Sequence, residues 1–106
     1  MLPVDIAVDL SRDPKTTGET LSQLANYEYF FTRYCVAKNP NTPKKVLCYL
    51  MKDKELLVRS GVAMNVTTSA EMLAVLIKDE EWEVVRQAID NPNCPIELKV
   101  EYILSN

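Results

Sequence analysis

The chain has 106 residues, of which 47% are hydrophobic and 25% charged, and its formal net charge is −3. This composition is ordinary for one small folded domain, and the acidic balance argues against strong nonspecific binding to a phosphate backbone. No apolar run approaches the roughly 18 residues that a membrane span requires, and the start of the chain lacks the basic segment of a secretion signal. We therefore expect a cytoplasmic protein with no membrane partner.

Cysteine and histidine content bears on metal binding and catalysis. The three cysteines, Cys35, Cys48 and Cys94, are widely spaced, and the chain has no histidine. We expect reduced thiols and neither a metal site nor a cofactor, because these thiols make an incomplete tetrahedral set for zinc. Without histidine the usual serine and cysteine triads are not available, and two glycines cannot form a phosphate-binding loop. We predict that the chain is not an enzyme.

Similar residues recur along the sequence every 26 positions. Asn39, Asn65 and Asn91 define this spacing, and Asp13 falls in the same column. Other columns with the same spacing are Leu21/Leu47/Leu73, Leu24/Leu50/Leu76, Arg33/Arg59, Val36/Val62 and Asp53/Asp79. In the third unit Arg86 comes one place late, which we interpret as a one-residue insertion near Trp82. Phased columns of this kind are typical of repeat proteins.

The spacing divides residues 1–106 into a single repeat domain. We predict a leading half-repeat (1–12), repeats at 13–38, 39–64 and 65–90, and a final half-repeat (91–106). Units of this size cannot bury an apolar face alone, so they are expected to stack. The sequence thus predicts an all-α fold with about four stacked repeats of 26 residues.

Each unit has the pattern of two short helices. In repeat 39–64 we expect Thr42 and Pro43 to start the first helix, Thr42 by accepting amide hydrogen bonds. Asn39 and Pro40 should end the preceding helix, with a conflict between the left-handed geometry that suits asparagine there and the restriction imposed by Pro40. Asp53 should cap the second helix. The expected apolar stripes are Val46, Leu47 and Leu50 in the first helix, and Leu56, Leu57, Val58 and Val62 in the second.

The segment "NPNTPKKVLCYLMKDKELLVRSGVAMN" (39–65) resembles the leucine-rich repeat variant (LRV) family, a HEAT-like α-solenoid family. The matching residues are Asn39, Pro40, Thr42, Pro43, Leu47, Leu50, Asp53, Val58, Arg59, Val62 and Ala63. The resemblance implies a right-handed superhelix of alternating α and 3₁₀ helices. Val66, Ser69, Cys94 and Tyr27 depart from the pattern. Some members carry a cysteine cluster for an iron–sulfur centre, a feature not found in this sequence.

Arg33, Arg59 and Arg86 form the first candidate binding group. In stacked units these guanidinium groups would lie in a row, where they could clamp phosphates or carboxylates. The alternative is an internal ladder in which each arginine binds Asp53, Asp79 or a carbonyl at a helix end.

Aromatic residues form a second candidate group. Tyr27 and Tyr29 align with polar positions of the next unit, so they are candidate interface anchors. Phe30 and Phe31 align with Leu56 and Leu57 and are expected in the core. Trp82, with acidic neighbours, is a candidate contact for a basic partner. Packing within the protein is the alternative for each of these residues.

Charge is uneven along the chain. Repeat 39–64 has five basic residues against two acidic, or +3, and repeat 65–90 has two basic against six acidic, or −4. Lys44 and Lys45 are the candidate contacts in the basic unit. Such a polarised surface favours contacts with a partner or between copies.

These features favour a non-catalytic scaffold that binds another protein. One alternative is a nucleic-acid-binding module that uses Lys44, Lys45, Lys52 and Lys54 with the arginine column. A second alternative is a structural subunit that self-associates end to end.

Overall fold

The computed structural model describes residues 2–105, which contain eight α-helices and no β-strand. Four helices have nine residues each: α1 (Val4–Arg12), α3 (Phe30–Lys38), α5 (Leu56–Met64) and α7 (Trp82–Asp90). They alternate with α2 (Gly18–Leu24), α4 (Lys44–Leu50), α6 (Ala70–Leu76) and α8 (Ile96–Ser105). In both sets, successive helices begin 26 residues apart. The predicted all-α class is confirmed.

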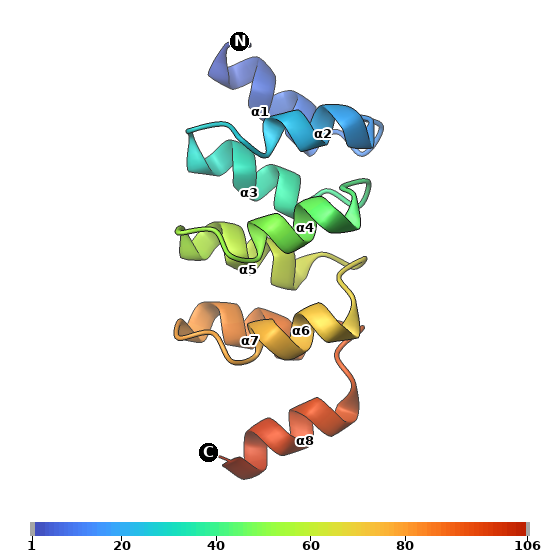
Figure 1. Cartoon of the computed structure of the whole chain (residues 1–106), viewed down its shortest axis with the longest axis vertical. Helices are drawn as coiled ribbons and strands as arrows, with labels where there is room; N and C mark the ends of the chain where they lie inside the picture. Colours follow the sequence, from blue (N-terminus) through green and yellow to red (C-terminus); the bar gives the residue numbers. More distant parts are fainter. Residues whose placement is uncertain (1, 106) are drawn as a thin grey trace.

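The helices follow one another in chain order along the longest axis of the molecule (Figure 1). This part of the chain measures 47 × 22 × 17 Å. The nine-residue helices pack against each other in sequence, α1 on α3, α3 on α5 and α5 on α7. The shorter helices form a second row beside them (Figure 1).

The core lies between the two rows. Its largest fully buried side chains from the shorter helices are Leu21, Leu24, Leu47, Leu50, Leu73 and Leu76. They meet Val36, Val58, Val62 and Val84 of the longer helices. The predicted leucine columns are therefore the buried face of the short helices, as helical spacing requires.

The predicted insertion near Trp82 is wrong. Helix α7 begins at Trp82 and α5 at Leu56, so the two helices keep the 26-residue spacing. Val85, and not Arg86, stands in the column of Arg59. The Val84-Val85-Arg86 run resembles a displaced Val-Arg pair in sequence, but Val84 is fully buried like Val58 and fixes the register.

Asparagine side chains join successive units. The side-chain amide of Asn65 donates to the carbonyl oxygens of Ala37 (2.8 Å) and Asn39 (2.9 Å), and its Oδ1 accepts the Thr67 N–H (2.8 Å). Equivalent bonds run from Asn39 to Ser11 and Asp13, and from Asn91 to Ala63 and Asn65. All three asparagines are buried, so their amides supply partners for helix-end carbonyls that would otherwise lack them.

The backbone at this joint is extended. Asn39 has φ −72° and ψ 126°, and within residues 2–105 no residue other than glycine has a positive φ. The left-handed geometry considered for Asn39 is therefore not adopted, which agrees with the restriction that Pro40 imposes.

Threonine hydroxyls after three of the longer helices donate hydrogen bonds to carbonyls of the last turns of those helices. Thr42 Oγ1 donates to the Val36 carbonyl at 2.6 Å, and Thr16 and Thr68 make the same bond to Leu10 and Val62. The prediction that Thr42 caps the following helix is therefore wrong. Helix α4 begins at Lys44, with Pro43 at the position before it.

The short helices are α-helical, so the predicted alternation with 3₁₀ helices is wrong. The amides of Leu21, Leu47 and Leu73 bond to carbonyls four residues earlier, at Thr17, Pro43 and Ser69. These bonds have the α-helical separation. The prediction that Phe30 lies in the core is also wrong, because Phe30 is exposed at the start of α3.

Thr32 occupies the buried column of Val58 and Val84, and its hydroxyl has no hydrogen-bond partner. We expect Thr32→Val to raise the free energy of unfolding by about 1 kcal/mol, because a buried hydroxyl without a partner costs stability. Urea denaturation followed by circular dichroism measures the change.

Thr68→Val is the matched control, since Thr68 is equally buried but its hydroxyl donates to Val62 at 2.6 Å. That variant should lose stability. A loss at Thr32 of similar size would contradict the prediction.

Candidate partner-binding surface

Arg33 is held inside the structure. Its Nε and Nη2 donate to the carboxylate of Asp53 at 2.8 and 3.1 Å, and its Nη1 donates to the carbonyls of Tyr27 (2.8 Å) and Glu28 (2.7 Å). Both side chains of the pair are 9% exposed. This two-point geometry is the strongest form of arginine–carboxylate contact.

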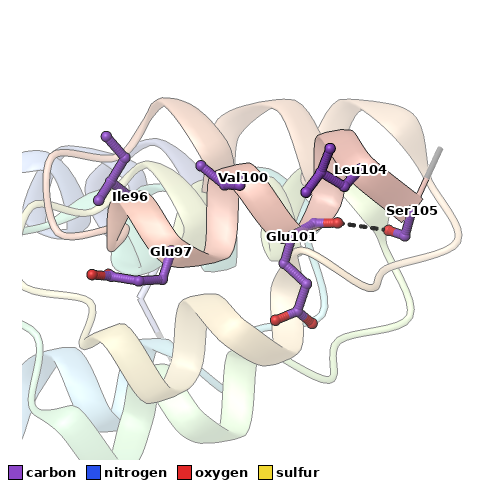
Figure 2. Close-up of a pocket in the computed structure, with 6 residues that line it drawn as sticks. All are labelled: Ile96, Glu97, Val100, Glu101, Leu104 and Ser105. Carbon is purple, nitrogen blue, oxygen red and sulfur yellow. Dashed lines mark hydrogen bonds between the residues drawn. The ribbon is translucent and has the colours of Figure 1, made fainter.

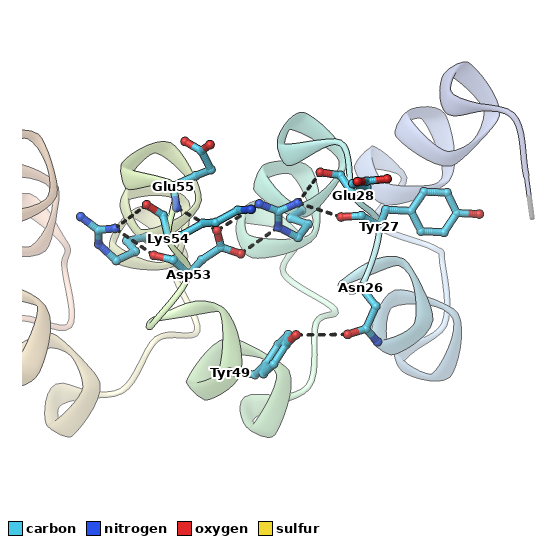
Figure 3. Close-up of polar contacts among 9 residues, drawn as sticks. Asn26, Tyr27, Glu28, Tyr49, Asp53, Lys54 and Glu55 are labelled. Atoms are coloured by element: carbon cyan, nitrogen blue, oxygen red, sulfur yellow. Dashed lines mark hydrogen bonds and ion pairs between the residues drawn. The ribbon is translucent and has the colours of Figure 1, made fainter.

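Arg59 repeats the arrangement one unit later. It bonds to the Asp79 carboxylate at 2.8 and 3.2 Å. It also donates to the carbonyls of Asp53 and Lys54 (Figure 3). Because Arg33 and Arg59 are both occupied, their interpretation as an exposed row for partner phosphates or carboxylates is wrong. They form the internal ladder that was the alternative.

The Asp53 carboxylate is kept charged by its surroundings. Burial alone would raise the pKa of Asp53. Hydrogen bonds from Arg33 and from the Glu55 N–H, together with the positive charges of Arg33 and Lys54, outweigh burial and hold this pKa below its ordinary value. The same bond to Asp53 raises the pKa of Arg33.

The series of arginine–aspartate pairs does not extend beyond Arg33 and Arg59, because other residues stand at the equivalent positions. The position equivalent to Arg33 one unit earlier is Ala7, and the position equivalent to Asp53 is Tyr27. Tyr27 is half-buried, and its hydroxyl accepts the Leu2 N–H at 3.0 Å. One unit after Arg59, the ladder position is Val85. Tyr27 thus packs against the core and holds the first residues of the chain.

Arg86 lies apart from the other two arginines. It bonds to Asp90 at 2.9 Å on the surface, with the two side chains 58% and 54% exposed. Its guanidinium lies 5.9 Å from the centre of the Trp82 ring. Trp82 is the exposed first residue of α7 and does not lie in an inserted loop.

A groove of about 1050 Å³ opens between the end of α2 and α4. Tyr49 lies in it and is 60% exposed. Its hydroxyl donates to Asn26 Oδ1 at 3.2 Å, which links the two sides of the groove (Figure 3). We call this feature, lined by Asn26, Tyr27, Lys45, Tyr49, Lys52 and Lys54 among others, the lysine–tyrosine groove.

Lysines determine the charge of the lysine–tyrosine groove. Lys45, Lys52 and Lys54 are exposed along it, as is the carboxylate of Glu28, while the charge of Asp53 is neutralised by Arg33. A neighbouring basin of about 550 Å³ shares Lys52, Asp53 and Lys54 and adds Lys78 together with the acidic Asp79 and Glu80. The predicted residues Tyr27, Arg33 and Lys45 therefore meet in one place, whereas Lys44 is exposed but does not line the groove.

Tyr29 belongs to a separate aromatic cluster. It is exposed, and its ring lies 5.7 Å from that of Phe30 and 6.2 Å from that of Phe31. Phe31 in turn lies 5.6 Å from Tyr34. The structure therefore does not bring Tyr29 and Trp82 to the groove.

Tyr49 and Asn26 were missed from the sequence. Tyr49 stands between the buried columns of Leu47 and Leu50, aligned with Gln23 and Val75. An exposed position of a short helix that carries an aromatic ring beside lysines was the available signal.

Three free cysteines are present, with Cys35 and Cys94 buried, and burial raises the pKa of both thiols. Within residues 2–105, no group of three or more metal-ligating side chains is found. None of the helices described is both long and apolar enough to cross a membrane.

Comparison of the chain with protein-family models, with curated proteins and with solved structures finds no match.

Proposed function

We propose that this chain is a non-catalytic α-solenoid scaffold of the LRV kind that binds an acidic segment of another protein in the lysine–tyrosine groove. The observation that supports this site is that the exposed Tyr49 lies with Lys45, Lys52 and Lys54 along one groove. Aromatic anchors surrounded by charged groups are a common composition of protein-binding sites.

Recurring bonds support the solenoid part of the proposal. The asparagine bonds and the arginine–aspartate pairs recur at 26-residue intervals and link neighbouring helix pairs. A right-handed superhelix is the arrangement that the LRV resemblance implies. These internal bonds hold the backbone beneath the groove, so a partner meets a preformed surface.

Charge supports an acidic partner. Of the two carboxylates that line the groove, Asp53 is held by two bonds from Arg33 and is only partly exposed, and Glu28 is exposed. The three groove lysines therefore outnumber the one exposed carboxylate, and the net positive charge attracts carboxylates and speeds encounter.

Nucleic acid is the second candidate and is less favoured. It depended on an arginine row that would meet phosphates, but Arg33 and Arg59 donate to aspartates and backbone carbonyls. Of the residues named for this function only Lys44, Lys45, Lys52 and Lys54 remain, on a chain whose net charge is −3.

Fluorescence anisotropy tests the proposal with a labelled peptide rich in Asp and Glu that contains one leucine. We expect Lys52→Glu to weaken binding by about tenfold, since it replaces an attraction by a repulsion in the groove. Tyr49→Ala should have a similar effect. Lys15→Glu makes the same charge change away from the groove and should bind like the unaltered chain.

Equal weakening by Lys15→Glu and Lys52→Glu would show that only net charge matters and would reject the site. A labelled DNA duplex is measured in the same buffers. Binding of the duplex at low salt, without binding of the peptide, would favour the nucleic-acid function instead.

A further inference from the structure

A cavity of about 360 Å³ lies in the row of longer helices, where α1 and α3 pack against each other. It shares no lining residue with the lysine–tyrosine groove. Its volume falls within the roughly 300–1,000 Å³ that is usual for small-molecule sites. Its lining residues are Arg12 at the end of α1, Phe31, Tyr34, Cys35 and Lys38 of α3, and Asn39 and Pro40 after α3.

The charged residues that line this cavity are both basic. Arg12 and Lys38 are exposed and stand at the last positions of α1 and α3. Among the residues that the structure describes, neither forms an ion pair, whereas the other arginines, Arg33, Arg59 and Arg86, each bind an aspartate. The two cations are therefore available to an anion from solution.

Carboxylates near the cavity come from the α1 segment. Asp5, Asp9 and Asp13 are exposed there, and none of them lines the cavity. The Asp13 carboxylate accepts the Lys15 N–H at 2.9 Å. Helices α3 and α5 contain no carboxylate between their first and last residues. An anion in the cavity would therefore meet the two cations without a carboxylate in its wall.

The Cys35 thiol shows that both positive charges reach the wall of the cavity. Burial raises the pKa of this thiol, and the charges of Arg12 and Lys38 act against that rise. The two side chains thus act on one point although they come from different helices.

Aromatic rings form the rest of the wall. The rings of Phe31 and Tyr34 lie 5.6 Å apart, and the Lys38 ammonium lies 4.9 Å from the centre of the Tyr34 ring. A Cβ at Gly61 would lie 3.1 Å from Tyr34 Cδ1, so the ring occupies space that a side chain on α5 would need. Contacts on two sides therefore hold the Tyr34 ring, and with it the cation, in place.

Stacking of the units does not require basic residues at these positions. Arg12 and Lys38 stand in one 26-residue column, which continues with Met64 and Asp90. The column therefore tolerates apolar and acidic side chains. Its two basic members are the ones that share the aromatic cavity.

The hollow along α8 has a different composition. Its volume is about 610 Å³, and its apolar residues Ile96, Val100 and Leu104 are accompanied by the carboxylates of Glu97 and Glu101 (Figure 2). No basic residue is among the described residues that line it. An anion is therefore favoured between α1 and α3 and not at α8.

We propose that the cavity between α1 and α3 binds a mononucleotide, with the phosphate at Arg12 and Lys38 and the base on the ring of Phe31. Arginine and lysine are the side chains that bind phosphate most often, and bases of any identity stack on aromatic rings. An acidic peptide would use the two cations alone, whereas a nucleotide uses the cations and the rings. This site is separate from the groove and goes beyond the proposed function.

Nuclear magnetic resonance of the ¹⁵N-labelled chain of residues 1–106 tests the proposal by titration with adenosine monophosphate. We expect saturable shifts of the backbone amides of Arg12, Lys38 and Asn39. Adenosine and inorganic phosphate should each bind at least roughly tenfold more weakly, because each makes half of the contacts. No saturable shift, or shifts confined to the lysine–tyrosine groove, would overturn the proposal. So would equal affinities for inorganic phosphate and adenosine monophosphate.

Two kinds of variant separate the phosphate contact from the base contact. Arg12→Gln and Lys38→Gln should each weaken adenosine monophosphate by roughly tenfold and leave adenosine unchanged. Phe31→Leu should weaken adenosine monophosphate by a similar factor and leave inorganic phosphate unchanged. Leucine stands at the equivalent position 57, so the fold accepts this change.

Lys78→Gln is the matched control, since it removes the same charge from an exposed lysine outside the cavity. It should bind adenosine monophosphate like the unaltered chain, and a loss as large as that of Lys38→Gln would reject the site. Tyr49→Ala should also bind it normally, which separates this site from the groove. Tighter binding of a short single-stranded DNA than of the mononucleotide would show a nucleic-acid surface instead and would overturn the proposal.

Discussion

Replacing Asn65 with alanine is expected to lower the free energy of unfolding by about 3–5 kcal/mol, because it leaves buried carbonyl groups without donors. The Asn65 amide is the donor to the carbonyls of Ala37 and Asn39, and its oxygen accepts the Thr67 N–H. These bonds join two units, so their loss should loosen the contact between α3 and α5. Urea denaturation of both proteins measures the change.

Asn41→Ala is the matched control for this prediction. Asn41 is exposed and its amide makes one bond, to the Thr16 carbonyl at 2.6 Å. Its loss should cost about 1 kcal/mol, the usual net value of one hydrogen bond. Similar losses for Asn41 and Asn65 would show that the buried asparagines do not hold the units together.

Replacing Arg33 with alanine is expected to cost about 3–5 kcal/mol, because it leaves a largely buried carboxylate without its partner. That carboxylate belongs to Asp53, which receives two bonds from Arg33. The carbonyls of Tyr27 and Glu28 also lose a donor. The double variant Arg33→Ala/Asp53→Ala should be more stable than the sum of the single losses predicts, since it removes the unpaired charge as well.

The exposed pair Arg86–Asp90 supplies the comparison within the same chain. Its side chains are 58% and 54% exposed. We expect Arg86→Ala to cost less than about 0.5 kcal/mol, as for other exposed pairs in helices. If Arg33→Ala were equally mild, the internal ladder would contribute little to stability.

The pH dependence of stability gives a second measurement on the Arg33–Asp53 pair. The pKa of Asp53 is lowered in the folded chain, so the unfolded chain binds this proton more readily. The pair's contribution is therefore present in full above the ordinary carboxyl pKa of about 3.9, and it is lost as the pH falls through the lowered value. The double variant should lose less stability than the unaltered chain over that acidic range.

The sequence by itself determined the helical class, the 26-residue spacing of the helices and the buried faces of the short helices. This information is local. Leu47 and Leu50 share a face because helical geometry puts residues three apart together, and the Asn39–Pro43 joint separates two helices through short-range backbone restrictions. The first helix of repeat 39–64 was accordingly expected within one residue of its observed start at Lys44.

Only the tertiary structure decided which polar residues face inward. Arg33 meets an aspartate 20 residues later, and Asn65 meets a carbonyl 28 residues earlier, so neither contact follows from local periodicity. The same holds for Arg86, whose place depended on the packing of Val84 in the core. Tyr49 and Lys52 became a candidate site because α4 lies beside the end of α2. Contacts between neighbouring units, rather than properties of single segments, separate the internal ladders from the surfaces that remain open to a partner.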